Sequence, residues 1–159
     1  MLNITLISIG KIKEDYFLSA CKEYEKMLGG FCRFSSDFLQ DEKLSPDPSD
    51  KEIENILNKE GENILKKIPQ NAYIIALCIE GKEMSSTQLA AEIEKISLNN
   101  SNLCFIVGSS FGLCEKVKAR ADLKLSMSKM TFPHNLARVM LLEQIYRSLS
   151  ILGNRKYHK

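Results

Sequence analysis

The chain has 159 residues, 44% of them hydrophobic and 26% charged, and it carries a formal net charge of +2. This composition excludes disordered and collagen-like proteins, and the longest apolar runs fall far short of the roughly 20 residues that a membrane-spanning helix needs. We therefore expect a soluble protein folded as a single domain over residues 1–159.

Hydrophobic periodicity predicts strands and helices that alternate along the chain. Strands are expected at residues 2–9, 31–39, 72–79, 103–107 and 123–127. Helices are expected over residues 13–28, 49–68, 85–98 and 133–152, with a short helical turn before the fifth strand. This alternation predicts an α/β fold, with a mostly parallel sheet flanked by helices.

Three of the helix starts carry clear signals. Ser49 with Glu52 and Ser85 with Gln88 both fit the capping-box pattern, in which a hydroxyl and a side chain three residues later satisfy free backbone N–H groups. Pro133 suits the first position of the last helix, where its missing N–H costs nothing. These signals predict where the second, third and last long helices begin.

The third strand, residues 72–79, is almost wholly apolar and lies between Pro69 and Gly81. Such a run is typical of a strand that is buried on both faces of a parallel sheet. Ligands bind such sheets at the carboxyl ends of the strands. The predicted binding loops are therefore those that follow the third, fourth and fifth strands.

Two of these loops contain a glycine close to the strand end, Gly81 and Gly108. A glycine there is either an ordinary turn residue or a residue that lets the backbone approach a ligand closely. Neither loop holds a dinucleotide-binding or P-loop fingerprint. Ser109 and Ser110 lie outside the G-x-S-x-G nucleophile motif, so hydrolase chemistry is not expected.

The histidines and cysteines do not form a metal-binding pattern. His134 is expected on the surface at the start of the last helix, and His158 in the terminal tail. The five cysteines form no C-x-x-C pair and have no histidine at ligand spacing, which disfavours both zinc and a disulfide framework. The N-terminal segment lacks a secretory signal, so we expect a cytoplasmic protein.

The small net charge conceals an asymmetry along the chain. Residues 1–100 carry 12 basic and 17 acidic side chains, a balance of −5, whereas residues 101–159 carry 10 basic and 3 acidic side chains, a balance of +7. The C-terminal third is therefore a candidate surface for a polyanion. The alternative is that its helices simply expose a solvated basic face.

The last helix is apolar on more than one narrow stripe. Its apolar positions are Leu136, Val139, Met140, Leu142, Ile145, Tyr146 and Leu149. A helix with such a wide apolar surface is expected to bury a second face, here against another subunit. On its polar side, Glu143 and Arg147 have the i, i+4 spacing of a helical ion pair.

Six segments together resemble the ribosomal RNA large-subunit methyltransferase H family. They are Ser126–His134 (SMSKMTFPH), Arg138-Val139, Glu143–Arg147 (EQIYR), the terminal Tyr157-His158-Lys159, Ile7–Lys11 and Leu77–Lys82. This family belongs to the SPOUT methyltransferases, which are α/β proteins with a C-terminal trefoil knot, a rare exception to the rule that chains are not knotted.

The resemblance implies that S-adenosylmethionine is the methyl donor, bound in the knot by three loops without a metal. By position, the donor would be held by Leu77, Gly108, Met127, Ser128, Lys129, Met130, Thr131 and Phe132. The family usually has Gly-Gly-Ser where this chain has Gly108-Ser109-Ser110. If that second position needs a positive φ, Ser109 would add up to about 1 kcal/mol of strain.

The reaction that the resemblance implies is methyl transfer to N3 of a pseudouridine in 23S rRNA of the assembled ribosome. A weak base or a cation near the acceptor suffices to remove the imide proton, and the candidates are His158, Arg138 and Arg147. The candidate RNA-binding residues are Arg155, Lys156, Tyr157, His158 and Lys159. The family also implies a homodimer with its active site near the subunit interface.

Other classes share parts of this pattern. A flavodoxin-like mononucleotide-binding protein needs a phosphate-cradling loop near residues 8–14, but Gly10-Lys11 is followed there by Ile12. A non-catalytic RNA-binding module would explain the basic C-terminal third, but it does not require glycine loops at the strand ends. A SPOUT methyltransferase that acts on a different RNA is the third alternative.

Overall fold

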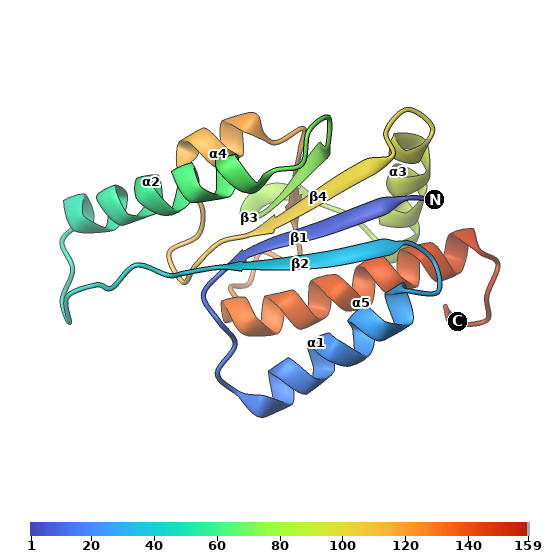
Figure 1. Cartoon of the computed structure of the whole chain (residues 1–159), viewed down its shortest axis with the longest axis horizontal. Coiled ribbons are helices and arrows are strands. Elements are labelled where there is room, and N and C mark those ends of the chain that lie inside the picture. Colours follow the sequence, from blue (N-terminus) through green and yellow to red (C-terminus); the bar gives the residue numbers. More distant parts are fainter. Residues whose placement is uncertain (159) are drawn as a thin grey trace.

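A computed structural model of the chain describes residues 1–158 (Figure 1). The strands are β1 (Asn3–Ile9), β2 (Arg33–Leu39), β3 (Tyr73–Glu83), β4 (Asn102–Val107) and β5 (Leu123–Ser126). The helices are α1 (Asp15–Leu28), α2 (Asp50–Lys67), α3 (Ser86–Ser97), α4 (Glu115–Arg120) and α5 (His134–Leu152). Strands and helices alternate as the periodicity predicts, apart from small shifts at their ends.

The strands form one five-stranded sheet in the order β2-β1-β4-β3-β5, and all paired strands run parallel. The predicted α/β class with a mostly parallel sheet is therefore confirmed. β3 lies between β4 and β5, and its segment Ile74–Ala76 is buried, as its apolar sequence predicts. Because β4, β3 and β5 are neighbours, their carboxyl ends meet at one edge of the sheet.

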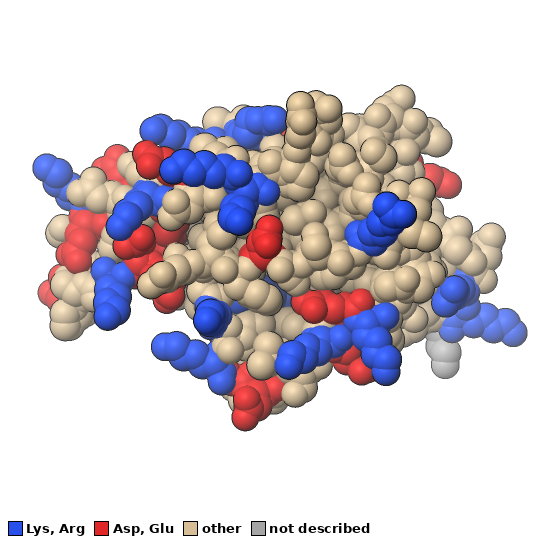
Figure 2. Space-filling view, in the orientation of Figure 1, with Lys and Arg blue, Asp and Glu red and all other residues tan. Residues whose placement is uncertain are grey.

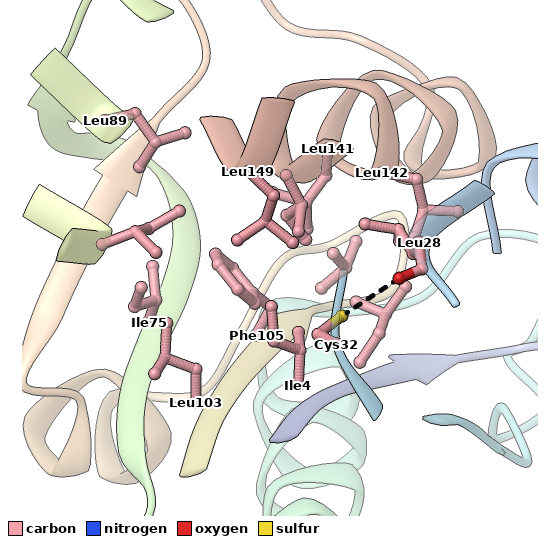
Figure 3. Packing of buried hydrophobic residues seen from close by; sticks show 14 of the residues in the cluster. Ile4, Leu28, Cys32, Ile75, Leu89, Leu103, Phe105, Leu141, Leu142 and Leu149 are labelled. Atoms are coloured by element: carbon pink, nitrogen blue, oxygen red, sulfur yellow. Dashed lines mark hydrogen bonds between the residues drawn. The ribbon is translucent and has the colours of Figure 1, made fainter. Parts of the chain in front are cut away.

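The helices form a layer on each face of the sheet. α1, α3 and α5 pack on one face, while α2 and α4 pack on the other (Figure 1). Figure 3 shows Leu141 and Leu149 of α5 facing Phe105 of β4 and Ile4 of β1. Each fully buried side chain of this kind contributes about 1.5–3 kcal/mol to folding. No helix among the described residues combines the length and apolar character needed to cross a membrane.

The two predicted capping boxes differ in the structure. At α3 the box is complete, because the Ser85 hydroxyl accepts from the Gln88 N–H and the Gln88 side chain accepts from the Ser85 N–H. At α2 only the Ser49 half is present, because the Glu52 carboxylate instead accepts from the N–H and the hydroxyl of Ser45. These bonds lower the pKa of Glu52 and tie the preceding loop to the helix.

Arg138 of α5 is buried against the end of β1. Its guanidinium donates to the carbonyl oxygen of Gly10 at 2.8 Å and also to that of Ile9. Burial is the main cause that lowers the pKa of Arg138 to about 10, so the group stays charged at neutral pH. Gly10 has a φ of +82°, which turns the chain away from the sheet at this point. Arg138 thus fastens α5 to the carboxyl end of β1.

We expect Arg138→Lys to lower the free energy of unfolding by about 2–3 kcal/mol. A single ammonium group cannot replace the planar guanidinium, which donates hydrogen bonds to both carbonyl oxygens. Urea denaturation measures this loss. The exposed Arg120 of α4 provides the control, and Arg120→Lys should stay within about 0.5 kcal/mol of the wild type. Equal stability of the two variants would contradict the structural role of Arg138.

Candidate active site

A cavity of about 310 Å³ lies at the carboxyl ends of β3, β4 and β5. Its walls come mainly from residues 77–80, 107–113 and 127–134. These are the loops after the third, fourth and fifth strands that the sheet topology predicts as binding loops. The volume falls in the range of small-molecule sites in proteins.

The residues expected to hold the cofactor come together around this cavity. Those that line it are Leu77, Gly108, Met127, Ser128, Met130, Thr131 and Phe132. Lys129 belongs to the same loop but does not line the cavity, and its side chain is exposed. The structure therefore assembles all of the expected set except Lys129, and their binding of a cofactor stays a prediction.

The loop after β5 is held by its own serines. The Ser126 hydroxyl donates to the carbonyl oxygen of Ser128 at 3.0 Å, and the Ser128 hydroxyl accepts from the Met130 N–H at 3.0 Å. Such side-chain to main-chain bonds stabilise a turn that has no regular structure. These two serines therefore shape the cavity wall, and Ser128 also lines it.

Gly108 is required because the loop after β4 folds back on itself. A Cβ atom at Gly108 would lie 2.2 Å from the carbonyl oxygen of Gly112. The Gly112 N–H donates to the Ser109 carbonyl oxygen at 2.9 Å, and Gly112 has a φ of +86°. Ser109 itself does not adopt a positive φ, so the strain considered for this position does not arise.

Gly81 has a different role from the expected one. It does not line the cavity, and a Cβ atom there would lie 2.7 Å from main-chain atoms of Lys124 and Leu125 in β5. The pairing of β3 with β5 also shifts register between Leu77 and Lys82. Of the two roles that the sequence leaves open for Gly81, the structure shows neither: this glycine lies within β3, outside the cavity wall, and lets the backbone of β5 pass close to β3.

Two polar pairs that the sequence patterns did not predict line the cavity. The Lys118 ammonium lies 2.6 Å from the Glu80 carboxylate and lowers its pKa. His134 is half-buried in the wall, with Nδ1 3.3 Å from the Ser110 hydroxyl oxygen. Burial and the nearby Arg138 lower the pKa of His134, so the ring is neutral at pH 7. His134 is thus the first residue of α5, as expected, but it is only partly at the surface because it also lines the cavity.

None of the three catalytic candidates, Arg138, Arg147 and His158, lines the cavity. Arg138 holds the end of β1, as described above. Arg147 pairs with Glu143 at 2.6 Å and lies 3.3 Å from Nδ1 of His158. The structure thus brings Arg147 and His158 together but separates both of them from Arg138.

The C-terminal tail folds onto α5 in the residues that the structure describes. The Tyr157 ring packs edge-on against Tyr146 at 4.8 Å and lies 4.7 Å from the Arg147 guanidinium. Arg155 lies 4.2 Å from the Phe31 ring, while Lys156 is exposed. Lys159, the last of the RNA-binding candidates, lies outside the described residues.

Basic side chains lie beside the C-terminal end of the chain, and others gather over α2 and α4, at the upper left of the same view (Figure 2). Basic side chains on this face are therefore not confined to the tail. A tail with this charge suits contact with a phosphate backbone.

A groove lined by α1, α5 and the loop after β5 adjoins the cavity. Its residues are Tyr24, Met127, Val139, Met140, Glu143 and Gln144. Met127 lines both the groove and the cavity, so the two are neighbours. By contrast, Leu142, Ile145 and Leu149 are buried in the core of the chain itself. Much of the apolar excess of α5 is therefore explained without a partner.

A family model described as "Predicted SPOUT methyltransferase" matches residues 2–158. By fold and cavity, the chain is thus an α/β methyltransferase of the SPOUT class. A relative from Clostridium beijerinckii, named "Ribosomal RNA large subunit methyltransferase H", is 48% identical over 99% of this chain and 100% of its own length. The chain belongs to the ribosomal RNA large subunit methyltransferase H family, which confirms the resemblance seen in the sequence.

A second relative has the same name. This relative, from Clostridioides difficile, is 46% identical, again over 99% of this chain and 100% of its own length. A solved structure, "a probable methylase family protein from Haemophilus influenzae", has a TM-score of 0.52 and 13% identity. It covers 99% of this chain and 70% of that chain, and at this identity it supports the fold alone.

We expect Gly108→Ala to lower the free energy of unfolding by about 1–3 kcal/mol, because its Cβ atom would overlap the Gly112 carbonyl and push the loop apart. Gly30→Ala is the matched control, since its Cβ atom would make only an ordinary contact at 3.5 Å. Thermal unfolding of both variants measures the difference. A Gly108→Ala protein as stable as the control would show that the loop is not tightly closed.

Proposed function

We propose that this chain transfers a methyl group from S-adenosylmethionine to N3 of a pseudouridine in 23S rRNA. The observation that carries the proposal is the cavity at the carboxyl ends of β3, β4 and β5 in a chain of this family. Residues 1–159 act as one domain, and the C-terminal trefoil knot of SPOUT proteins is part of the same proposal. An rRNA substrate also implies a cytoplasmic protein.

The cavity has the chemistry that this donor requires. Leu77, Met130 and Phe132 give it apolar walls, and the Gly108–Gly112 loop places main-chain groups beside them. S-adenosylmethionine supplies a methyl group on a sulfonium, which already carries its leaving group. The chain itself therefore has to bind and orient the donor and acceptor more than it has to activate them.

The acceptor side of the site is proposed to come from a second subunit. The imide proton at N3 has to leave, and Arg147 with His158 offers a cation beside an imidazole for this step. Neither residue lines the cavity of its own chain, but both lie on α5 or the tail near the groove that joins the cavity at Met127. If two copies pair through this groove, the tail of each chain lies beside the cavity of the other.

Arg155 and Lys156 are proposed to bind the rRNA backbone, because both side chains are exposed and basic. These contacts do not read sequence, so the choice of base depends on how one unstacked nucleotide fits beside the methyl donor. A pseudouridine has a free N1–H that uridine lacks. A protein group that accepts from this N1–H would distinguish the two bases.

We expect the purified protein to bind S-adenosylhomocysteine in the presence of a metal chelator and, in a separate assay without chelator, to methylate ribosomes. Ribosomes that contain the pseudouridine should react at least about tenfold faster than ribosomes lacking it, since one buried hydrogen bond is worth about 1–3 kcal/mol. Mass spectrometry of the rRNA locates the methyl group. Methylation of a ribose, of tRNA or equally of uridine would indicate another SPOUT specificity, and absence of cofactor binding would favour an RNA-binding module.

We expect light scattering to give twice the chain mass of 18.0 kDa, and Met140→Asp to shift the protein toward the monomer by placing an unpaired charge in the groove. Leu98→Asp is the control, because Leu98 is 78% exposed and lies away from the groove residues. A wild-type mass near that of one chain at micromolar concentration would contradict the dimer. Equal effects of the two variants would place the interface elsewhere.

A further inference from the structure

Glu60 is a buried carboxyl residue in the middle of α2. Its side chain is 3% exposed, and none of the ion pairs among residues 1–158 includes it. Burial raises its pKa, and the neighbouring Asp41 and Glu42 raise it further. Because burying a carboxyl group is costly unless it is hydrogen-bonded, the polar partners of Glu60 show what this position does.

The side-chain partner of Glu60 lies in the loop that walls the cavity. The Ser109 hydroxyl donates to Oε2 of Glu60 at 3.0 Å, and a backbone hydrogen bond from Glu42 also reaches the carboxyl group. The next residue, Gly61, lets α2 approach this region, because a Cβ atom there would lie 2.2 Å from Sγ of Cys114. The Glu60-Gly61 pair therefore brings α2 against both ends of the loop that runs from β4 to α4.

The loop is supported from two sides. On the α2 side Glu60 holds Ser109, and on the α5 side Ser110 lies 3.3 Å from Nδ1 of His134. Ser109 and Ser110 both line the cavity, whereas Glu60 does not. Glu60 thus acts on the cavity only through the loop.

We propose that Glu60 is a positioning residue for the methyl-donor site. Through Ser109 it holds residues 108–112 in the conformation that forms the cavity wall, and so sets the affinity for the donor. The identity of the ligand in this inference rests on the proposed function. The effect of Glu60 on the loop does not depend on it.

A double-mutant cycle separates positioning from a general effect on α2. We expect Glu60→Met and Ser109→Ala each to raise the dissociation constant of S-adenosylhomocysteine about tenfold, as the loss of one buried hydrogen bond would. The double variant should show the same increase of about tenfold, because the second change has no bond left to remove. Glu62→Met, an exposed position on the same helix, is the matched control and should bind as the wild type does.

Amide hydrogen exchange of the cofactor-free protein tests the loop without any ligand. Exchange at residues 109–112 should accelerate about tenfold in Glu60→Met and Ser109→Ala, with the rest of α2 unchanged. Failure of the wild type to bind S-adenosylhomocysteine would contradict the proposed function and leave this test intact. Unchanged exchange in the loop, or effects on binding that multiply to about a hundredfold in the double variant, would overturn the role of Glu60.

Discussion

The cavity depends on main-chain segments that meet with no side chain between them. At Gly108 the loop after β4 folds against the carbonyl of Gly112, and at Gly81 the strand β3 admits the backbone of β5. In both places a Cβ atom would lie closer than real Cβ contacts allow. The first contact closes one wall of the cavity, and the second places β5 so that its loop forms the opposite wall. Two glycines therefore set the separation of the walls.

Much of this arrangement could be predicted from the sequence, because it follows from local patterns. The apolar run that becomes β3, the glycine after β4 and the alternation of strands and helices were enough to predict a parallel sheet with binding loops at three strand ends. The roles of single residues were harder to predict. In the sequence, a glycine at position 81 is compatible with a ligand contact and with a close approach of a neighbouring strand. Only the register shift between β3 and β5 shows which of these two roles Gly81 has.

Contacts between distant segments determine roles that the sequence patterns do not show. Arg138 suited a catalytic cation by its position in the family motif, yet it bonds to carbonyls of residues 9 and 10, far away in the sequence. The sequence does not single out Glu60, because a glutamate on an amphipathic helix is normally solvated. A signal was present, however: Glu60 precedes a glycine inside a helix, which points to a close approach by another segment.

The division of polar groups between the cavity and α5 argues for a site shared by two chains. The cavity wall contains a neutral His134 and an internally paired Glu80 and Lys118, so it offers no free cation to an imide anion. Outside the cavity, Arg147 and His158 place a cation beside an imidazole, and Arg147 is itself paired with Glu143, a residue of the groove next to the cavity. Glu143 holds the Arg147 guanidinium in an ion pair, and Arg147 still lies close to His158. The Tyr157 ring packs over the same guanidinium. Burial is the largest cause that raises the pKa of Tyr157 to about 12, and its hydrogen bond with Tyr24 is the next. An aromatic ring of this kind can stack on a base. Donor binding within one chain and acceptor binding by the tail of its partner would then require dimerisation before methyl transfer.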